Sequence, residues 1–209
     1  MIGRWITRKI NARIAERRRK QTWVMNAAIA EHVIPRSEDA VDALDQVDVD
    51  ALSPWDIAHW LNARAYALGF MGCTTEALEH LRDAEELLTG IEHTEPVPAA
   101  HVELLASCII GTRGIALLHG DSLNEAETHL ERALALGASQ LEKASADMLA
   151  QQQQLAAERL WWLAAIAEKR GDTAHRLHCL RRASQFRDTR YGAEACKALG
   201  HDGAADRAR

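Results

Sequence analysis

The sequence predicts an all-α fold built from helical hairpins, and three observations support this prediction. Of the 209 residues, 47% are hydrophobic and only four are proline, while the good helix formers Ala, Leu, Glu, Gln and Arg dominate between the prolines. No segment sustains the alternation of apolar and polar residues that is typical of a strand. A spaced trio of small residues also recurs along the chain, as expected for repeated hairpins.

The members of the trio are separated by twelve and then by seven positions. Small residues at such positions let two helices approach closely. The clearest copies are Ala65, Ala77 and Ala84, then Gly114, Ala126 and Ala133, with Ala164, Arg176 and Ala183 as a copy with one misfit and Ala28, Ala40 and Val47 as a fainter one. At the misfit, either the last hairpin splays or Ala174 takes the position of Arg176.

Capping and helix-breaking residues set the helix boundaries in the first half of the chain. Pro35 disfavours a helix in the residue before it, and acids follow where a helix dipole favours them. Ser53 is the expected N-cap of a helix that begins at Pro54, and Gly72 breaks the chain before the return helix. The predicted helices cover 4–34, 37–45, 54–71 and 74–88, followed by a loop over 90–98.

Two Gly-Asp pairs mark the expected turns in the second half of the chain. Gly120-Asp121 and Gly171-Asp172 each separate a long helix from its return helix, and Gly137 is the expected C-cap between the two hairpins. The predicted helices cover 99–119, 123–136, 139–170, 173–186 and 191–199, and a polar tail follows.

With these trios the chain resembles the tetratricopeptide repeat family. That family carries W-x2-L-G-x2-Y on the first helix of each repeat, and Ala, a bulky residue four on, and a further Ala on the second. The matching residues are Leu61, Ala65 and Leu68 with Ala77, Leu81 and Ala84; Ile110, Gly114 and Leu117 with Ala126, Leu130 and Ala133; and Leu160, Leu163, Ala164 and Ala167 with Leu180 and Ala183. The hairpins recur here every 49 or 50 residues, against about 34 in the family.

The resemblance implies a right-handed array of about four antiparallel hairpins over 21–187. It leaves 1–20 as a basic amphipathic N-terminal extension and 188–209 as a short capping helix with a polar tail. It also implies a concave face, lined by the first helix of each hairpin, that binds a partner peptide or helix. Carried onto this register, the candidate partner-binding residues are Asn62, Tyr66, Phe70 and Trp161.

Two qualifications apply to this binding face. Some members of the family clamp a C-terminal carboxylate with Lys and Asn at set positions, but only Asn62 stands at one of these positions, so the clamp is not predicted. Core packing between hairpins is the competing interpretation of the three aromatic residues. Of the adjacent Trp161 and Trp162, one is expected to pack inside and the other to be an exposed binding residue.

Residues 1–20 form the most strongly charged segment. Eight basic residues stand against Glu16 alone, which gives +7 and leaves −12 for the rest of the chain. Apolar residues at helical spacing make the segment amphipathic, so it can lie on an anionic membrane, bind nucleic-acid phosphates or dock on an acidic partner. The candidate contacts are Arg4, Arg8, Arg13 and Arg17. The competing interpretation is internal, with the segment capping the first hairpin beside the acids of 38–50.

No motif indicates an enzyme, a metal site or a cofactor. A Gly-rich phosphate loop after a strand is absent, and no Ser or Cys nucleophile lies in a catalytic motif. The four cysteines are too scattered for a zinc or redox motif. His175, His178 and Cys179 share a helix face, but ligands from one helix rarely complete a metal site.

We therefore expect a non-enzymatic adaptor or chaperone-like module that binds a protein segment as a monomer or homodimer. The alternative is a membrane- or nucleic-acid-associated regulator that uses the basic N-terminal helix. The chain has no secretory apolar region and no apolar run of the ~18 residues needed to span a bilayer, so the expected location is the cytoplasm.

Overall fold

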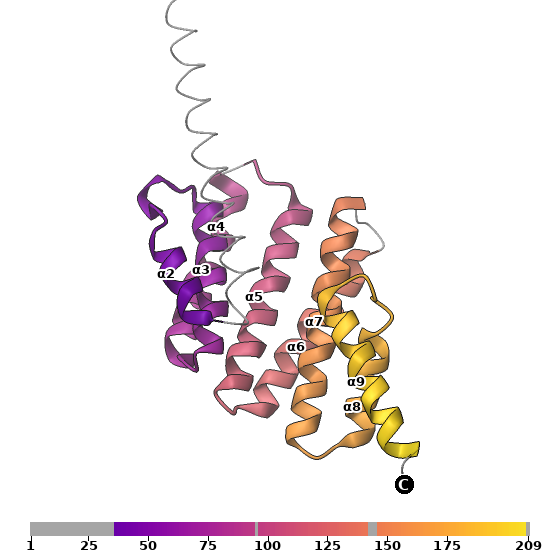
Figure 1. Cartoon of the computed structure of the whole chain (residues 1–209). Helices are drawn as coiled ribbons and strands as arrows, with labels where there is room; N and C mark the ends of the chain where they lie inside the picture. The colour runs from indigo at the N-terminus through magenta and orange to yellow at the C-terminus, as the bar shows by residue number, and fades with distance from the viewer. Residues whose placement is uncertain (1–35, 95, 142–145, 208–209) are drawn as a thin grey trace, which may run out of the picture. The chain divides into compact units, whose positions relative to one another are not determined.

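The structure of the protein is a computed structural model that describes residues 36–94, 96–141 and 146–207. Within these ranges the chain is helical and contains no strand, which confirms the all-α prediction (Figure 1). The elements are α2 (Ser37–Asp45), the 3-10 helix η2 (Val49–Ala51), α3 (Pro54–Phe70), α4 (Thr74–Thr94), α5 (Ala99–His119), α6 (Leu123–Leu141), α7 (Ala146–Lys169), α8 (Thr173–Ala183) and α9 (Arg190–Arg207). The helix predicted over 4–34 lies outside the described residues.

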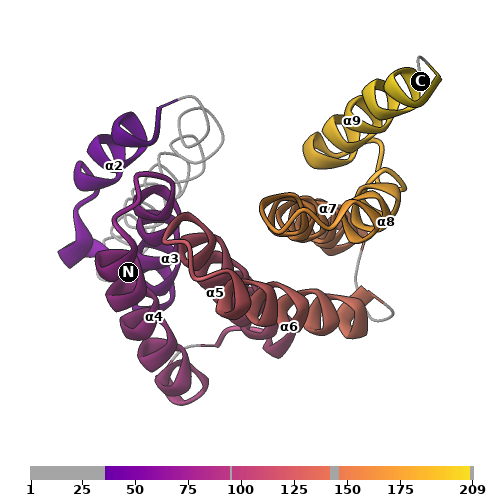
Figure 2. The same cartoon turned by 90° about the horizontal axis from the view of Figure 1, so that it is seen from below.

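The chain divides into two compact units, one ending at Pro96 and the other beginning at Val97. This division falls inside the segment 21–187, which was expected to form one repeat array. In the first unit, α3 packs against both α2 and α4. In the second unit, α5 pairs with α6 and α7 with α8, α6 also contacts α7, and α9 packs against α7 and α8 (Figure 2).

Local capping chemistry places several helix ends where the sequence predicts them. Ser53 Oγ accepts a hydrogen bond of 3.2 Å from the Asp56 amide, and Pro54 is the first helical residue. Asp172 likewise caps α8 by accepting from the His175 amide at 2.9 Å. Gly72 and Gly171 have φ angles of +76° and +73°, a conformation that glycine adopts without steric cost.

Five predicted boundaries are wrong, and tertiary packing explains two of them. Helix α4 continues through Gly90 to Thr94, where a loop was expected, because Ile91 is fully buried and holds the extra turns. Gly137 lies inside α6 rather than at its end, for a reason given below. Helix α8 ends at Ala183 instead of 186, and α9 continues well beyond 199. Ser139, the expected start of the fourth hairpin, belongs to α6.

In the part of the chain that the structure describes, the small residues of the repeated trio lie at helix contacts; Ala28 lies outside it. Ala77 and Ala126 are fully buried. A methyl group at Gly114 would stand 2.7 Å from Leu130 Cγ and 3.0 Å from the Ala126 carbonyl oxygen, so α5 and α6 approach too closely for any side chain there. At the misfit position, Arg176 extends to Glu168 at 3.7 Å.

Of the two explanations offered for this misfit, the one in which Ala174 replaces Arg176 is wrong. Ala174 is exposed, so it does not take the position of Arg176 in the packing.

Helix α5 is the most apolar helix of the second unit and packs mainly against α6. Among the described residues it alone is long and apolar enough to cross a membrane by length and composition, and 67% of that window is buried inside the protein. Its apolar character matches the burial of most of its residues from Leu104 to Leu118.

Candidate functional site

Helix α3 carries three of the four residues predicted to bind a partner. Asn62, Tyr66 and Phe70 follow one another at intervals of four, so they form one row along the helix surface, and all three are half-buried. The buried residues Ala63 and Ala67 hold this row, which we call the α3 row, beside the contact with α2.

The two aromatic rings of the α3 row pack against α2. The ring centroids of Tyr66 and Phe70 are 5.1 Å apart, and both rings lie against the buried pair Ala40 and Ala67. Packing within the first unit therefore accounts for part of each ring's surface. Both residues are also partly exposed, so the same pair of rings contacts the core and borders solvent.

Asn62 adds an unsatisfied polar atom to the α3 row. Its Oδ1 atom is buried from solvent, and none of the residues that the structure describes places a donor within hydrogen-bond distance. Leaving a buried acceptor without a hydrogen bond costs about 1–3 kcal/mol, and such groups in a native structure call for an explanation. A rotation of this half-buried side chain that exposed Oδ1 beside the two rings would let it receive an N–H group from a bound segment.

Trp161, the fourth predicted partner-binding residue, lies on α7 in the second unit. Its ring centroid is 6.3 Å from that of Tyr191 on α9. The neighbouring Trp162 lies edge-on to both Tyr191 and His119, at 6.1 and 5.8 Å. The expectation that one tryptophan packs inside while the other is exposed is wrong: both are half-buried, because α9 and the end of α5 offer aromatic neighbours on two sides.

A polar and aromatic cluster joins the helices of the first unit, and the sequence reading missed it. Arg64 lies over the Trp60 ring at 5.6 Å and between Asp45 of α2 and Glu76 of α4, at 3.5 and 3.6 Å. The spacing of four residues between Trp60 and Arg64 was the available signal.

The same cluster contains His80 of α4. Its ring meets the Trp60 ring edge-on at 6.3 Å. Burial and the nearby Arg64 charge lower the pKa of His80, so this imidazole is held in its neutral form.

The second unit contains a buried cation that the sequence reading also missed. Arg159 of α7 is only 2% exposed. It donates to the Ala133 carbonyl at 2.7 Å and to both the carbonyl and the hydroxyl of Ser107, at 3.0 and 2.9 Å. Burial lowers its pKa from a very high starting value, so it remains a cation. Arg159 thus ties α7 to both helices of the preceding hairpin.

Room for Arg159 explains the position of Gly137. A methyl group at Gly137 would stand 2.8 Å from Arg159 Nη1. The glycine is therefore a packing residue within a helix rather than a helix end. Nearby, burial raises the pKa of Cys108 to about 11 against the opposing charge of Arg159, so this thiol is protonated and a poor nucleophile at neutral pH.

The remaining candidates are the four arginines of the N-terminal segment and the His and Cys residues of α8. Arg4, Arg8, Arg13 and Arg17 lie outside the described residues. Within the described ranges, no group of three or more His, Cys, Asp or Glu side chains could hold a metal ion. Of the three possible metal ligands on α8, His175, His178 and Cys179, the cysteine is buried, with its Sγ atom 3.5 Å from His175 Nε2.

Comparisons with known protein families, with curated proteins and with solved structures found no match to this chain.

Proposed function

We propose that this protein is a non-enzymatic interaction module, an adaptor or chaperone-like scaffold, that binds a partner peptide or helix along the α3 row. The observation that carries the proposal is the buried, unsatisfied Oδ1 atom of Asn62 beside the half-buried rings of Tyr66 and Phe70. Aromatic residues supply large apolar contact area at low entropic cost, and a buried acceptor gives direction to the contact.

The resemblance to tetratricopeptide repeats supports the same class of function. Ala65, Ala77 and Ala84 are fully buried in the first unit, at positions where that family keeps small residues. Because the repeats of that family present helices to a partner, the resemblance favours partner binding as the activity of the α3 row.

The alternative function is a membrane- or nucleic-acid-associated regulator that acts through residues 1–20. Its support is the net charge of +7 in that segment. Salt dependence separates the two, because phosphate binding weakens steeply as salt rises whereas apolar contacts do not. Binding to anionic vesicles or oligonucleotides that disappears when residues 1–20 are deleted would favour the alternative.

Capture of partners from the native lysate tests the proposal when wild type and variants are compared. Asn62→Leu and Tyr66→Ala serve as baits together with a matched control, Gln151→Leu, which changes an exposed residue of α7. We expect a protein that is retained by wild type and the control but lost from both α3 variants, with each variant first shown to be folded by circular dichroism.

The affinity of that protein for each variant is then measured by calorimetry. A loss of about tenfold or more at Asn62 or Tyr66 is expected for a central contact. Equal affinities for wild type and both α3 variants would refute the assignment of binding to this row.

A further inference from the structure

A basic surface surrounds the turn between α8 and α9. Arg181 and Arg182 lie in the last turn of α8, Arg187 lies in the turn itself, and Arg190 begins α9. All four residues are exposed. Asp188 is the sole acidic residue in the stretch 173–193, so this stretch carries a strong local excess of positive charge.

These four arginines have no ion-pair partner among the described residues, unlike other cations of the same unit. Lys169 and Arg170 each pair with a carboxylate at 2.6 Å, and Lys197 pairs with Glu194 at 2.7 Å. The guanidinium groups around the α8–α9 turn are therefore available to an external anion.

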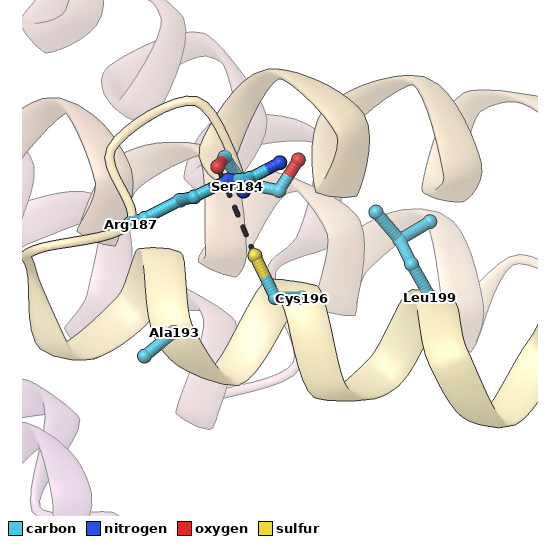
Figure 3. A pocket seen from close by; sticks show the side chains of 5 residues that line it. All are labelled: Ser184, Arg187, Ala193, Cys196 and Leu199. Atoms are coloured by element: carbon cyan, nitrogen blue, oxygen red, sulfur yellow. Dashed lines mark hydrogen bonds between the residues drawn. The ribbon is translucent and has the colours of Figure 1, made fainter.

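A pocket of about 570 Å³ opens within this basic surface. Its lining residues are Ser184, Arg187, Ala193, Cys196 and Leu199. Figure 3 shows Cys196 and Leu199 projecting from α9 toward α8, with the Cys196 thiol directed at the Ser184 carbonyl, a contact of 3.8 Å. The pocket thus combines an apolar lining with one guanidinium group at its side.

Two further arginines flank the pocket by their helical positions. Arg181 precedes Ser184, the C-cap of α8, by three residues, and Arg190 precedes Ala193 by three residues on α9. Residues three apart on a helix are neighbours on its surface. The charged groups therefore border the apolar lining instead of lying on the opposite face.

We infer that this surface binds an acidic segment of a partner protein and takes one of its aliphatic side chains into the pocket. The planar guanidinium group of arginine matches a carboxylate with two parallel hydrogen bonds. The apolar lining supplied by Ala193 and Leu199 suits an aliphatic group. These residues are distinct from the α3 row, so the inference does not depend on the proposed function.

The lining residues favour this occupant over two others. Single-stranded nucleic acids bind through aromatic side chains on which bases stack, and none of the described residues that line this pocket is aromatic. An amphipathic helix that lies on a membrane needs an extended apolar face rather than one pocket.

The test uses the full chain and a labelled peptide of glutamates around one leucine, with binding followed by fluorescence anisotropy. We expect Arg181→Gln and Arg187→Gln each to weaken binding about threefold and the double variant about tenfold, as surface charge pairs at separate positions do. Arg132→Gln is the matched control, because Arg132 is an exposed arginine of α6 away from this turn, and its affinity should equal that of wild type.

The pocket is tested separately from the charge. A second peptide with serine in place of leucine should bind more weakly to wild type, and Ala193→Leu, which fills the pocket, should remove this difference while melting normally. Equal binding by wild type and the arginine variants would overturn the inference. So would an oligothymidylate or phosphatidylserine vesicles that bind more tightly than the peptide with the same dependence on Arg181 and Arg187.

Discussion

At the scale of single residues, Asn62 and Arg159 show how differently polar groups are treated in the two units. Arg159 is deeply buried, and its three hydrogen bonds reach two other helices. Asn62 has a buried oxygen without a hydrogen bond in a half-buried side chain. The first arrangement stabilises the fold, whereas the second leaves the cost of burying a polar atom uncompensated among the described residues.

Replacing Asn62 by leucine tests that cost. Because Asn62→Leu removes a buried acceptor and keeps a similar shape, the free energy of unfolding should stay the same or rise by up to about 1 kcal/mol. Urea denaturation measures this change. A loss of stability larger than about 1 kcal/mol would instead show that the amide already contributes to the fold, and the α3 row would lose its main support as a binding site.

Arg159 and Gly137 are expected to be energetically coupled. Arg159→Met should lower the free energy of unfolding by about 2–4 kcal/mol, because three buried acceptors lose their donor. Gly137→Ala alone should cost about 1–3 kcal/mol, since the new methyl group displaces the guanidinium from the Ala133 carbonyl.

The coupling itself is measured in the double variant. Once Arg159 is methionine, Gly137→Ala should be nearly neutral or stabilising, because alanine is the better helix former by about 1 kcal/mol. Additive effects of the two substitutions would mean that the Arg159 side chain does not require a glycine at position 137.

At the scale of helices, the repeated small residues determine how closely two helices approach. Gly114→Ala should destabilise the protein by about 1–3 kcal/mol, because the methyl group would meet Leu130 and the backbone of α6. Thermal denaturation followed by circular dichroism measures the effect.

Gly90 provides the matched control for Gly114. It also lies within a helix, but a methyl group there would meet no atom within 4 Å. Gly90→Ala should therefore raise stability by about 0.5–1 kcal/mol. If both substitutions changed stability in the same direction, close packing would not be the property that distinguishes these two glycines.

Helix boundaries show which features could be predicted from sequence and which could not. Ser53, Gly72 and Gly171 act through their own backbone and side-chain chemistry, so local rules locate the turns at these residues. In the sequence, Gly90 and Gly137 resemble the turn glycines, yet both lie inside helices. The helices continue through these glycines because Ile91 and Arg159 are buried, and that burial depends on helices distant in the sequence.

At the scale of the whole molecule, each unit contains a histidine whose pKa is lowered, first of all by burial. For His80 the second cause is the Arg64 charge, and for His119 it is the Lys169 charge. Both side chains are therefore held neutral in the folded protein, whereas the unfolded chain binds a proton at its ordinary pKa of 6.5.

This difference predicts a loss of stability on mild acidification in both units. Well above pH 6.5 neither state is protonated at these sites, and the histidines do not affect stability. As the pH falls below 6.5, the unfolded chain takes up protons first and the free energy of unfolding decreases. Hydrogen exchange followed by mass spectrometry at several pH values reports on each unit separately.

The variants His80→Phe and His119→Phe keep a ring beside Trp60 and Trp162 but cannot bind a proton. Each should flatten the pH dependence of hydrogen exchange between pH 7 and about 5.5 in its own unit and leave the other unit unchanged. An unaltered pH dependence in both variants would assign the effect to other groups.

The sequence by itself determined that this protein is helical, where its tight turns fall and which small residues lie at helix contacts. These properties follow from backbone preferences, capping and apolar spacing, which act over a few residues. Only the tertiary structure decided that Arg159 is buried and that Gly137 makes room for it. It also decided that the Tyr66 and Phe70 rings pack on α2 and that the Asn62 oxygen has no donor among the described residues. The physical reason is that burial and hydrogen bonding depend on what lies opposite a side chain, and the facing groups come from helices distant in the sequence.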